Sequence, residues 1–158
     1  MTRRSRLQAE LKQTRPFRSP AQEATLGILK TADVLRRRMA GLLQPYGLSG
    51  QAYNVLRILR GARGKPMATL EIASRLIEQT PGITRLLDGL EVKELVRRER
   101  CREDRRQVHC FITPAGLEVL RQLDPEVDEA EAAWSGRLSG AELEALITSL
   151  EKVRAGDH

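Results

Sequence analysis

The feature that most constrains this 158-residue sequence is a change of apolar spacing between residues 69 and 113. Apolar side chains first recur at helical intervals in two short segments, which begin at Thr69 and at Thr80-Pro81, where Thr80 is predicted to cap the helix and Pro81 to lie in its first turn. From Val96 to Ile112 they alternate instead, on either side of a very polar centre, which is typical of a β-hairpin with a charged tip. Two short helices joined by a tight turn and followed by a hairpin predict a winged helix-turn-helix.

Longer helices are predicted on both sides of this unit, each opened by a serine or threonine that can cap it. The capping segments are Ser19-Pro20-Ala21-Gln22, Ser49, Thr113-Pro114 and Ser139-Gly140-Ala141-Glu142. The first helix should run for about 25 residues and stop near Pro45 to Gly47. Asp124-Pro125 marks either a kink or a restart within the helix that follows the hairpin. The fold class is therefore mainly α with a small β-hairpin wing, and helices are added at both ends.

The charge of the chain is regional. The formal net charge of +6 is the balance of +12 over residues 1–113 and −6 over residues 114–158. Such a distribution is expected when one part of a protein faces a polyanion and another part does not. One Trp, two Tyr and two Phe are too few for the stacking platforms that hold single-stranded nucleic acid, so duplex is the favoured polyanion.

Several other classes of protein are disfavoured by the composition. The sequence has neither an apolar stretch of membrane-spanning length nor the apolar core of a signal peptide, so we expect a soluble cytoplasmic protein with no membrane partner. Two cysteines make no disulfide framework. No nucleophile motif, phosphate-binding glycine loop or metal-ligand cluster is recognisable, so we expect no catalytic residues, no metal and no cofactor.

Three segments together resemble the MarR (multiple antibiotic resistance regulator) family of bacterial transcription factors. They are LSGQAYNVLRIL, TLEIASRLIEQTPGITRLLDGLEVKELVRR and CREDRRQVHCFITPAG. The most specific part is Asp104-Arg105-Arg106, followed at the family's spacing by Ile112-Thr113 and Gly116. The resemblance extends from about Gln22 to Val153 and covers most of the chain.

The resemblance implies a homodimer joined through its first and last helices, which binds a palindromic operator in double-stranded DNA. It divides the chain into a basic N-terminal extension (1–19), a dimerisation helix (20–47), a winged helix-turn-helix lobe (48–113) and C-terminal dimerisation helices (114–158). The extension is expected to be a mobile basic tail, although Leu7 and Leu11 at helical spacing allow a short helix. Two-fold symmetry would place the two recognition helices about 34 Å apart, one turn of duplex.

In the family, the helix that begins near Thr80 enters a major groove. With its apolar stripe turned inward, the helix presents five residues outward near its start, namely Thr80, Gly82, Thr84, Arg85 and Asp88. Arg85 is the candidate for a base or phosphate contact, because a guanidinium grips two acceptors at once. The alternative is an ordinary solvated Arg85 that pairs with Asp88 or with another nearby acid.

The hairpin is the wing that the family places in a minor groove. Its arginines are Arg97, Arg98, Arg100, Arg102, Arg105 and Arg106. By resemblance, Asp104 orients the arginines and Arg105 or Arg106 enters the groove, whose narrow and negative floor attracts guanidinium groups. A merely solvated charged face is the alternative. Glu94 stands where the family usually has glycine; if this turn needs a positive φ, glutamate adopts it at an energetic cost.

A stripe of apolar residues on the last helix is predicted to cover a second copy of the chain. The stripe consists of Leu143, Leu146, Ile147, Leu150 and Val153. Packing of the stripe within one chain is the alternative. An isologous dimer would bury the stripe against its symmetry mate and the long first helix.

Members of the family commonly act as repressors that are released by a small aromatic or phenolic effector. Tyr53, Arg57 and Trp134 are the candidates for an effector pocket, and each is equally typical of a core, surface or interface position. Two other functions stay open: a winged-helix module for protein interaction, and a sequence-tolerant architectural DNA binder.

The two cysteines lie in the predicted hairpin. A hairpin centred between Arg105 and Arg106 would place Cys101 opposite Cys110. Some relatives sense oxidants through cysteine, which makes a redox-switched wing one interpretation and two buried or half-buried thiols the other. Zinc binding through Cys101, His109 and Cys110 is disfavoured, since a fourth ligand is missing.

Overall fold

The structure is a computed structural model that describes residues 5–155. Arg3 and Arg4 of the basic extension therefore lie outside the described residues. The chain divides after Gly41 into two units, which are described separately below.

The first unit contains a short helix and most of a long one. Helix α1 (Arg6–Glu10) is capped by Ser5, whose Oγ accepts from the backbone N of Gln8 at 3.2 Å. The Gln8 side chain is buried, and its Nε2 donates to the carbonyl oxygen of Arg15 at 3.1 Å. Of the two interpretations of the N-terminal extension, the structure therefore shows the short helix.

Helix α2 (Pro20–Leu43) confirms the predicted long first helix. The Ser19 Oγ accepts from the backbone N of Gln22 at 3.1 Å, and the Gln22 Oε1 accepts from the backbone N of Arg18 at 2.8 Å. In a capping box the second bond comes from the backbone N of the cap residue itself; here it comes from Arg18, one residue before Ser19. A 3₁₀ turn, η1 (Gln44–Tyr46), ends the helical stretch at Gly47, where φ is +62° and glycine is the favoured residue.

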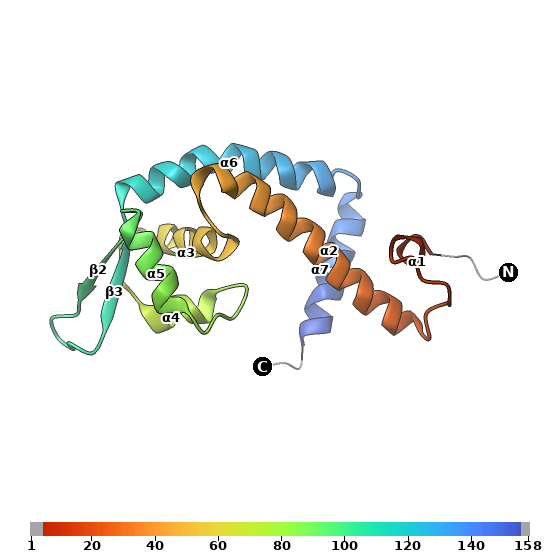
Figure 1. Ribbon diagram of the computed structural model, residues 1–158, viewed down its shortest axis with the longest axis horizontal. Coiled ribbons are helices and arrows are strands. Elements are labelled where there is room, and N and C mark those ends of the chain that lie inside the picture. Colours follow the sequence, from red (N-terminus) through yellow and green to blue (C-terminus); the bar gives the residue numbers. More distant parts are fainter. Residues whose placement is uncertain (1–4, 156–158) are drawn as a thin grey trace. The chain divides into compact units, whose positions relative to one another are not determined.

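In the second unit, three helices make the core of a small lobe (Figure 1). They are α3 (Gly50–Gly61), α4 (Thr69–Arg75) and α5 (Ile83–Val92). Ser49 caps α3 as predicted, with its Oγ accepting from the backbone N of Ala52. The fully buried side chains of these helices include Val55, Leu56, Leu59, Ile72, Leu87 and Leu90. The predicted apolar stripes are the ones that face inward.

The wing is an antiparallel hairpin of β2 (Val96–Arg100) and β3 (Val108–Ile112), which projects from the helices (Figure 1). A third strand, β1 (Met67–Ala68), pairs with the other edge of β3, so the sheet has the order β1-β3-β2. This strand was not predicted, because two residues are too few to show an alternating pattern.

The hairpin leads directly into α6 (Pro114–Ser135), which Thr113 caps. The Thr113 Oγ1 accepts from the backbone N of Gly116 at 3.0 Å and donates to the carbonyl oxygen of Glu94 at 2.6 Å. Glu94 has φ of +57°, so this turn has the positive φ that glycine adopts more easily. A Cβ on Gly116 would lie 2.4 Å from the carbonyl oxygen of Leu95, so only glycine allows this approach.

Helix α6 is continuous through Pro125, so the predicted alternative of a restart at Asp124-Pro125 is wrong. The Asp124 carboxylate binds the Arg60 side chain of α3 instead of capping a new helix. The last helix, α7 (Gly140–Arg154), begins with the predicted capping box, in which Ser139 and Glu142 exchange hydrogen bonds.

Within residues 5–155, no helix has both the length and the apolar character needed to cross a membrane. The same residues contain no group of three or more His, Cys, Asp or Glu side chains arranged to hold a metal ion.

Candidate nucleic-acid interface

The outward start of α5 differs from the prediction. Thr80 does not cap the helix, which begins at Ile83 with Gly82 as its N-cap at φ −108° and ψ 32°. The Thr80 Oγ1 instead accepts from the backbone N of Gly82 at 3.4 Å, within the turn that precedes the helix. Because no described side chain caps α5, its first N–H groups are open to an external acceptor.

The exposed side chains at this helix start include those of Thr84 and Arg85. Among residues 5–155, no acid pairs with Arg85; Asp88, the partner considered for it, binds Arg98 at 2.5 Å. The Arg85 guanidinium is thus left for a partner outside the protein.

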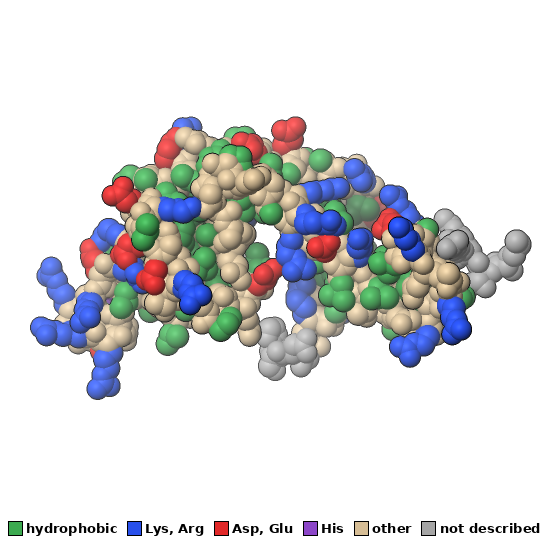
Figure 2. All heavy atoms as spheres, viewed as in Figure 1, with side chains coloured by type: hydrophobic (Ala, Val, Ile, Leu, Met, Phe, Trp, Pro, Cys, Tyr) green, Lys and Arg blue, Asp and Glu red, His purple; other side chains and the backbone are tan. Residues whose placement is uncertain are grey.

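The six arginines of the wing have two different roles. Arg97 lies over the ring of Phe111, 4.1 Å from its centroid, and forms an ion pair with Glu99. Arg98 turns toward α5 and is bound by two acids. The remaining arginines are exposed and have no ionic partner among the described residues: Arg100, Arg102, Arg105 and Arg106. Lys and Arg side chains gather at this projecting end of the molecule (Figure 2).

Asp104 shapes the tip of the hairpin through the backbone. Its Oδ1 accepts from the backbone N of Arg106 at 3.0 Å, and its Oδ2 accepts from the Gln107 side chain at 3.3 Å. Its carbonyl oxygen accepts from the backbone N of Gln107 at 2.9 Å. The resemblance implied that Asp104 orients the arginines. Its carboxylate fixes the turn that carries Arg105 and Arg106 and, among the described residues, binds neither guanidinium group.

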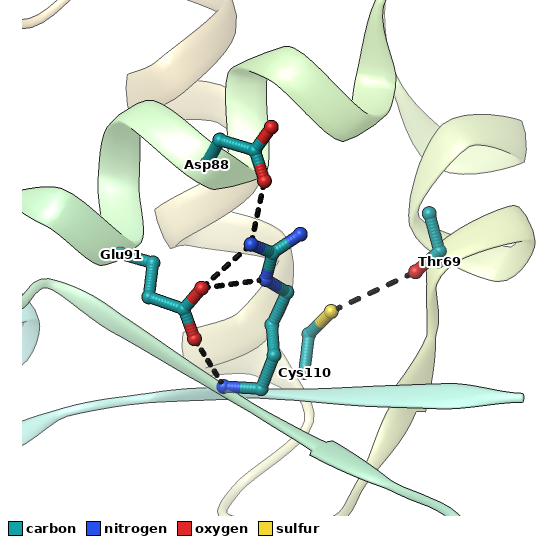
Figure 3. Close-up of polar contacts among 5 residues, drawn as sticks. Thr69, Asp88, Glu91 and Cys110 are labelled. Atoms are coloured by element: carbon teal, nitrogen blue, oxygen red, sulfur yellow. Dashed lines mark hydrogen bonds and ion pairs between the residues drawn. The ribbon is translucent and has the colours of Figure 1, made fainter. Parts of the chain in front are cut away.

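Arg98 of β2 is hydrogen-bonded to Glu91 and Asp88 of α5, the two acids labelled in Figure 3, and so connects the wing to this helix. Its Nε and Nη2 donate to Oε2 of Glu91 at 3.0 and 2.6 Å, and its backbone N donates to the second oxygen, Oε1, at 3.1 Å. Its Nη2 also donates to Oδ1 of Asp88. Hydrogen bonds from Arg98 lower the pKa of Glu91, and the same bonds raise the pKa of Arg98. From the sequence, Arg98 was predicted only as one of the arginines of the wing. Its partner Glu91 lies seven residues upstream, close enough in the chain for a pair to be considered.

The predicted facing of the two thiols is wrong. The hairpin register pairs Cys110 with Arg98, while the backbone N of Cys101 donates to the carbonyl oxygen of Gln107 at 2.9 Å. The hairpin is centred on Asp104, so the two cysteines are offset by three residues along the strands, about 10 Å. This exceeds the reach of a disulfide.

The two thiols also differ in environment. Cys110 is fully buried, its Sγ lies 3.9 Å from the Thr69 Oγ1, and burial raises its pKa (Figure 3). Cys101 is half-buried and lines a surface hollow of about 380 Å³ with Arg100, Arg102 and Arg105. His109 belongs to neither thiol's contacts and pairs in register with Glu99 and Ala68.

Two of the three candidate effector residues lie together. Tyr53 is buried, burial raises its pKa, and the Arg57 guanidinium lies 5.8 Å from its ring centroid. Beside them, Arg60 binds Asp124, an ion pair that sequence reasoning missed because the partners are 64 residues apart. Trp134 lies on α6, ten residues beyond Asp124 and about 15 Å from it along the helix, and its place in a pocket with Tyr53 stays a prediction.

The apolar stripe of α7 is partly exposed. None of the helix's 15 residues is buried. Ile147 is 50% exposed and Val153 is 64% exposed, whereas Leu143 and Leu150 are half-buried. The packing of this stripe against a second copy of the chain stays a prediction.

Comparison with known proteins decides the family. The model of the MarR family matches residues 48–108, from the start of α3 into the hairpin. The crystal structure of a MarR transcription factor from Planctomyces limnophilus is 39% identical in sequence, with a TM-score of 0.67 and coverage of 86% of this chain and 98% of that one. The chain belongs to the MarR family. It is a MarR-family transcriptional regulator, as the resemblance of its sequence segments implied.

Two more distant relatives extend the comparison for this MarR-family protein. A Thauera aromatica protein, described as a putative transcriptional regulatory protein for the hcr operon, is 27% identical over 111 residues, 70% of this chain and 66% of that protein. The chain thus spans slightly less than two thirds of that relative. The S. aureus MepR–DNA complex is 19% identical with a TM-score of 0.77, covering 89% of this chain and all of that one, and it supports the fold alone.

Proposed function

We propose that the chain is a homodimeric, sequence-specific DNA-binding regulator that represses transcription and is released by a small aromatic or phenolic ligand. One observation carries the DNA-binding part. Arg85 at the start of α5 and four arginines of the hairpin tip (Arg100, Arg102, Arg105 and Arg106) have no ionic partner among the described residues, whereas Arg60, Arg97 and Arg98 are bound within the protein. These two sites are the elements by which winged helix-turn-helix proteins read duplex DNA.

In the major groove, the start of α5 supplies one guanidinium and open backbone amides. Arg85 is placed to grip a guanine edge or a phosphate, and the small residues Thr80, Gly82 and Thr84 allow a close approach to the base edges. The unsatisfied N–H groups at the helix start favour a phosphate on the same side.

In the minor groove, the tip of the hairpin supplies Arg105 and Arg106. Asp104 holds the turn beneath them, so the two side chains extend from a fixed backbone. Guanidinium groups bind best where the groove is narrow and its potential most negative, which predicts A·T-rich DNA under the wing. That MepR, which shares the fold, was solved bound to DNA supports this docking.

The second copy of the chain is the proposed partner of the exposed stripe on α7. Side chains as exposed as Ile147 and Val153 stabilise an association when a symmetry mate buries them. A two-fold dimer presents two copies of α5 to one face of the duplex, which is why a palindrome is the expected operator.

The proposed effector site is the part of the α3 surface where Arg57 lies over Tyr53. An arginine beside an aromatic ring suits a ligand that carries both a ring and a negative charge. Repression that is released by a ligand is the commoner mode of regulation in the family, and we propose it for this chain on that ground.

Footprinting of the purified full-length protein on DNA flanking its own gene tests the proposal. The expected result is protection of one palindrome, with half-sites one helical turn apart, and loss of protection on addition of a benzoate or phenol from a panel. Absence of any footprint would favour the protein-interaction module. Protection spread evenly along the fragment would favour the architectural binder.

A further inference from the structure

The ion pairs of Arg98 with Glu91 and Asp88 differ from the Arg97–Glu99 pair because they join the wing to α5, the two elements that we propose contact DNA. Glu91 lies in the last turn of α5 and Arg98 in the middle of β2. One carboxylate accepts from the backbone N, the Nε and the Nη2 of the same arginine, so it holds both the strand and its side chain (Figure 3).

The covalent connection between α5 and the hairpin is short and contains a strained residue. Only Lys93, Glu94 and Leu95 separate α5 from β2, and Glu94 has φ of +57°. A non-glycine residue in that region persists when the surrounding contacts fix it. Two sets of side-chain contacts hold the backbone on either side of Glu94. They are the hydrogen bonds of Arg98 to Glu91, called the Arg98 clamp below, and the bond from the Thr113 hydroxyl to the carbonyl oxygen of Glu94.

Arg98 is poorly suited to bind DNA directly. Its side chain is 21% exposed, and its charge is opposed by two carboxylates within hydrogen-bond distance. A phosphate approaching Arg98 would meet the negative charge of Asp88 and Glu91 as well.

We propose that Glu91 and Arg98 are positioning residues that fix the angle of the wing relative to α5, and that the specificity of the protein for its operator depends on them although neither contacts DNA. The inference rests on the proposed DNA-binding function. The start of α5 and the wing are proposed to contact neighbouring grooves of the DNA. Their separation must stay fixed, because base contacts are lost when either element is displaced. Sequence-independent attraction to phosphate has no such requirement.

Glu91→Gln separates positioning from charge. The substitution keeps the side chain's shape but replaces one acceptor oxygen by a donor that faces the Arg98 donors. It also makes the protein more positive, so a purely electrostatic account predicts tighter binding to every DNA. The positioning account predicts about tenfold weaker binding to the operator, the loss of roughly one base contact, with unchanged or tighter binding to random-sequence duplex.

Glu103→Gln is the matched control. Glu103 is exposed on the same hairpin, and its removal adds the same charge without touching the clamp. We expect this variant to bind both the operator and random duplex at least as tightly as the wild type. Arg98→Lys, which keeps the charge but loses the planar donor pair, should resemble Glu91→Gln in its ratio of specific to non-specific binding.

The outcomes are distinguishable. If the wild-type protein protects no defined site, the proposed function fails before the positioning inference is tested. If the wild type is specific and Glu91→Gln binds the operator as tightly as Glu103→Gln does, the positioning inference is wrong. If thermal unfolding shows that Glu91→Gln does not fold, the positioning inference is tested by the ratio of specific to non-specific binding of the Arg98→Lys variant.

Discussion

Arg60 of α3 binds Asp124 of α6 with two guanidinium nitrogens, at 2.7 and 3.1 Å. The pair joins the helix that begins the lobe to the helix that leaves it, across 64 residues of sequence. Both side chains are partly exposed, at 35% and 41%, so solvent screens the attraction and the two-point geometry carries most of the effect.

Loss of this pair should lower stability modestly. We expect Arg60→Ala to reduce the free energy of unfolding by about 1 kcal/mol, measured by urea denaturation. Arg121→Ala is the control, because Arg121 binds Glu118 one turn away on the exposed face of α6 and its loss should lower the free energy of unfolding less than Arg60→Ala does. Equal effects of the two substitutions would contradict the role assigned to Arg60.

Gly116 should tolerate no side chain. A Cβ there would lie 2.4 Å from the backbone oxygen of Leu95 and 2.8 Å from the Ile112 side chain, and backbone cannot yield cheaply. We expect Gly116→Ala to lower the free energy of unfolding by about 2 to 3 kcal/mol. Gly89→Ala, in α5 with nothing within 4 Å of the added carbon, should be neutral or stabilising by up to about 1 kcal/mol. A stable Gly116→Ala protein would show that the start of α6 packs differently.

The thiols should react at very different rates. In the native protein, a thiol reagent should label Cys101, while Cys110 reacts only on unfolding because it is fully buried and its pKa is raised. Cys101→Ser should remove the fast phase, and mild oxidation should yield no disulfide within one chain. Rapid labelling of Cys101→Ser, or an intrachain disulfide under native conditions, would show that the hairpin register is not the one described.

The stability of the lobe should fall on acidification through Glu91. The folded-state pKa of Glu91 lies below its ordinary value of 4.5, so its contribution is present above that value and lost as the pH falls through the folded pKa. Urea denaturation across pH 6 to 2 should show a shallower acid decline for Glu91→Gln than for the wild type. Identical declines for the two proteins would mean that Arg98 does not hold Glu91 in solution.

The sequence was informative where a local chemical rule determines the structure. Ser49, Thr113 and Ser139 begin helices as predicted, because a cap satisfies amides only a few residues away. The prediction that Thr80 caps α5 is wrong, because the Thr80 hydroxyl accepts from the backbone N of Gly82 within the turn that precedes the helix. At Glu94 the sequence indicated only that a positive φ would be costly for glutamate, and the structure shows a φ of +57° there.

Features that depend on the strand register, or on partners far apart in the sequence, could not be predicted from local sequence patterns. A hairpin centred on Asp104 instead of between Arg105 and Arg106 shifts every cross-strand pair, which separates Cys101 from Cys110. The division of the wing arginines into bound and unbound ones depends on which way each side chain points. The roles of Arg98 and Arg60 therefore emerged only from the structure.

The most direct test of the account is the affinity of Arg105→Ala plus Arg106→Ala for the footprinted palindrome, measured as a function of salt concentration. Arg121→Ala plus Arg137→Ala removes the same charge from the C-terminal helices and their connection and serves as the control. We predict that the wing variant binds at least about tenfold more weakly, with a salt slope reduced by about one or two, while the control stays close to the wild type. Wild-type affinity of the wing variant for the palindrome would contradict the central claim that the unbound arginines of the hairpin hold this protein on DNA.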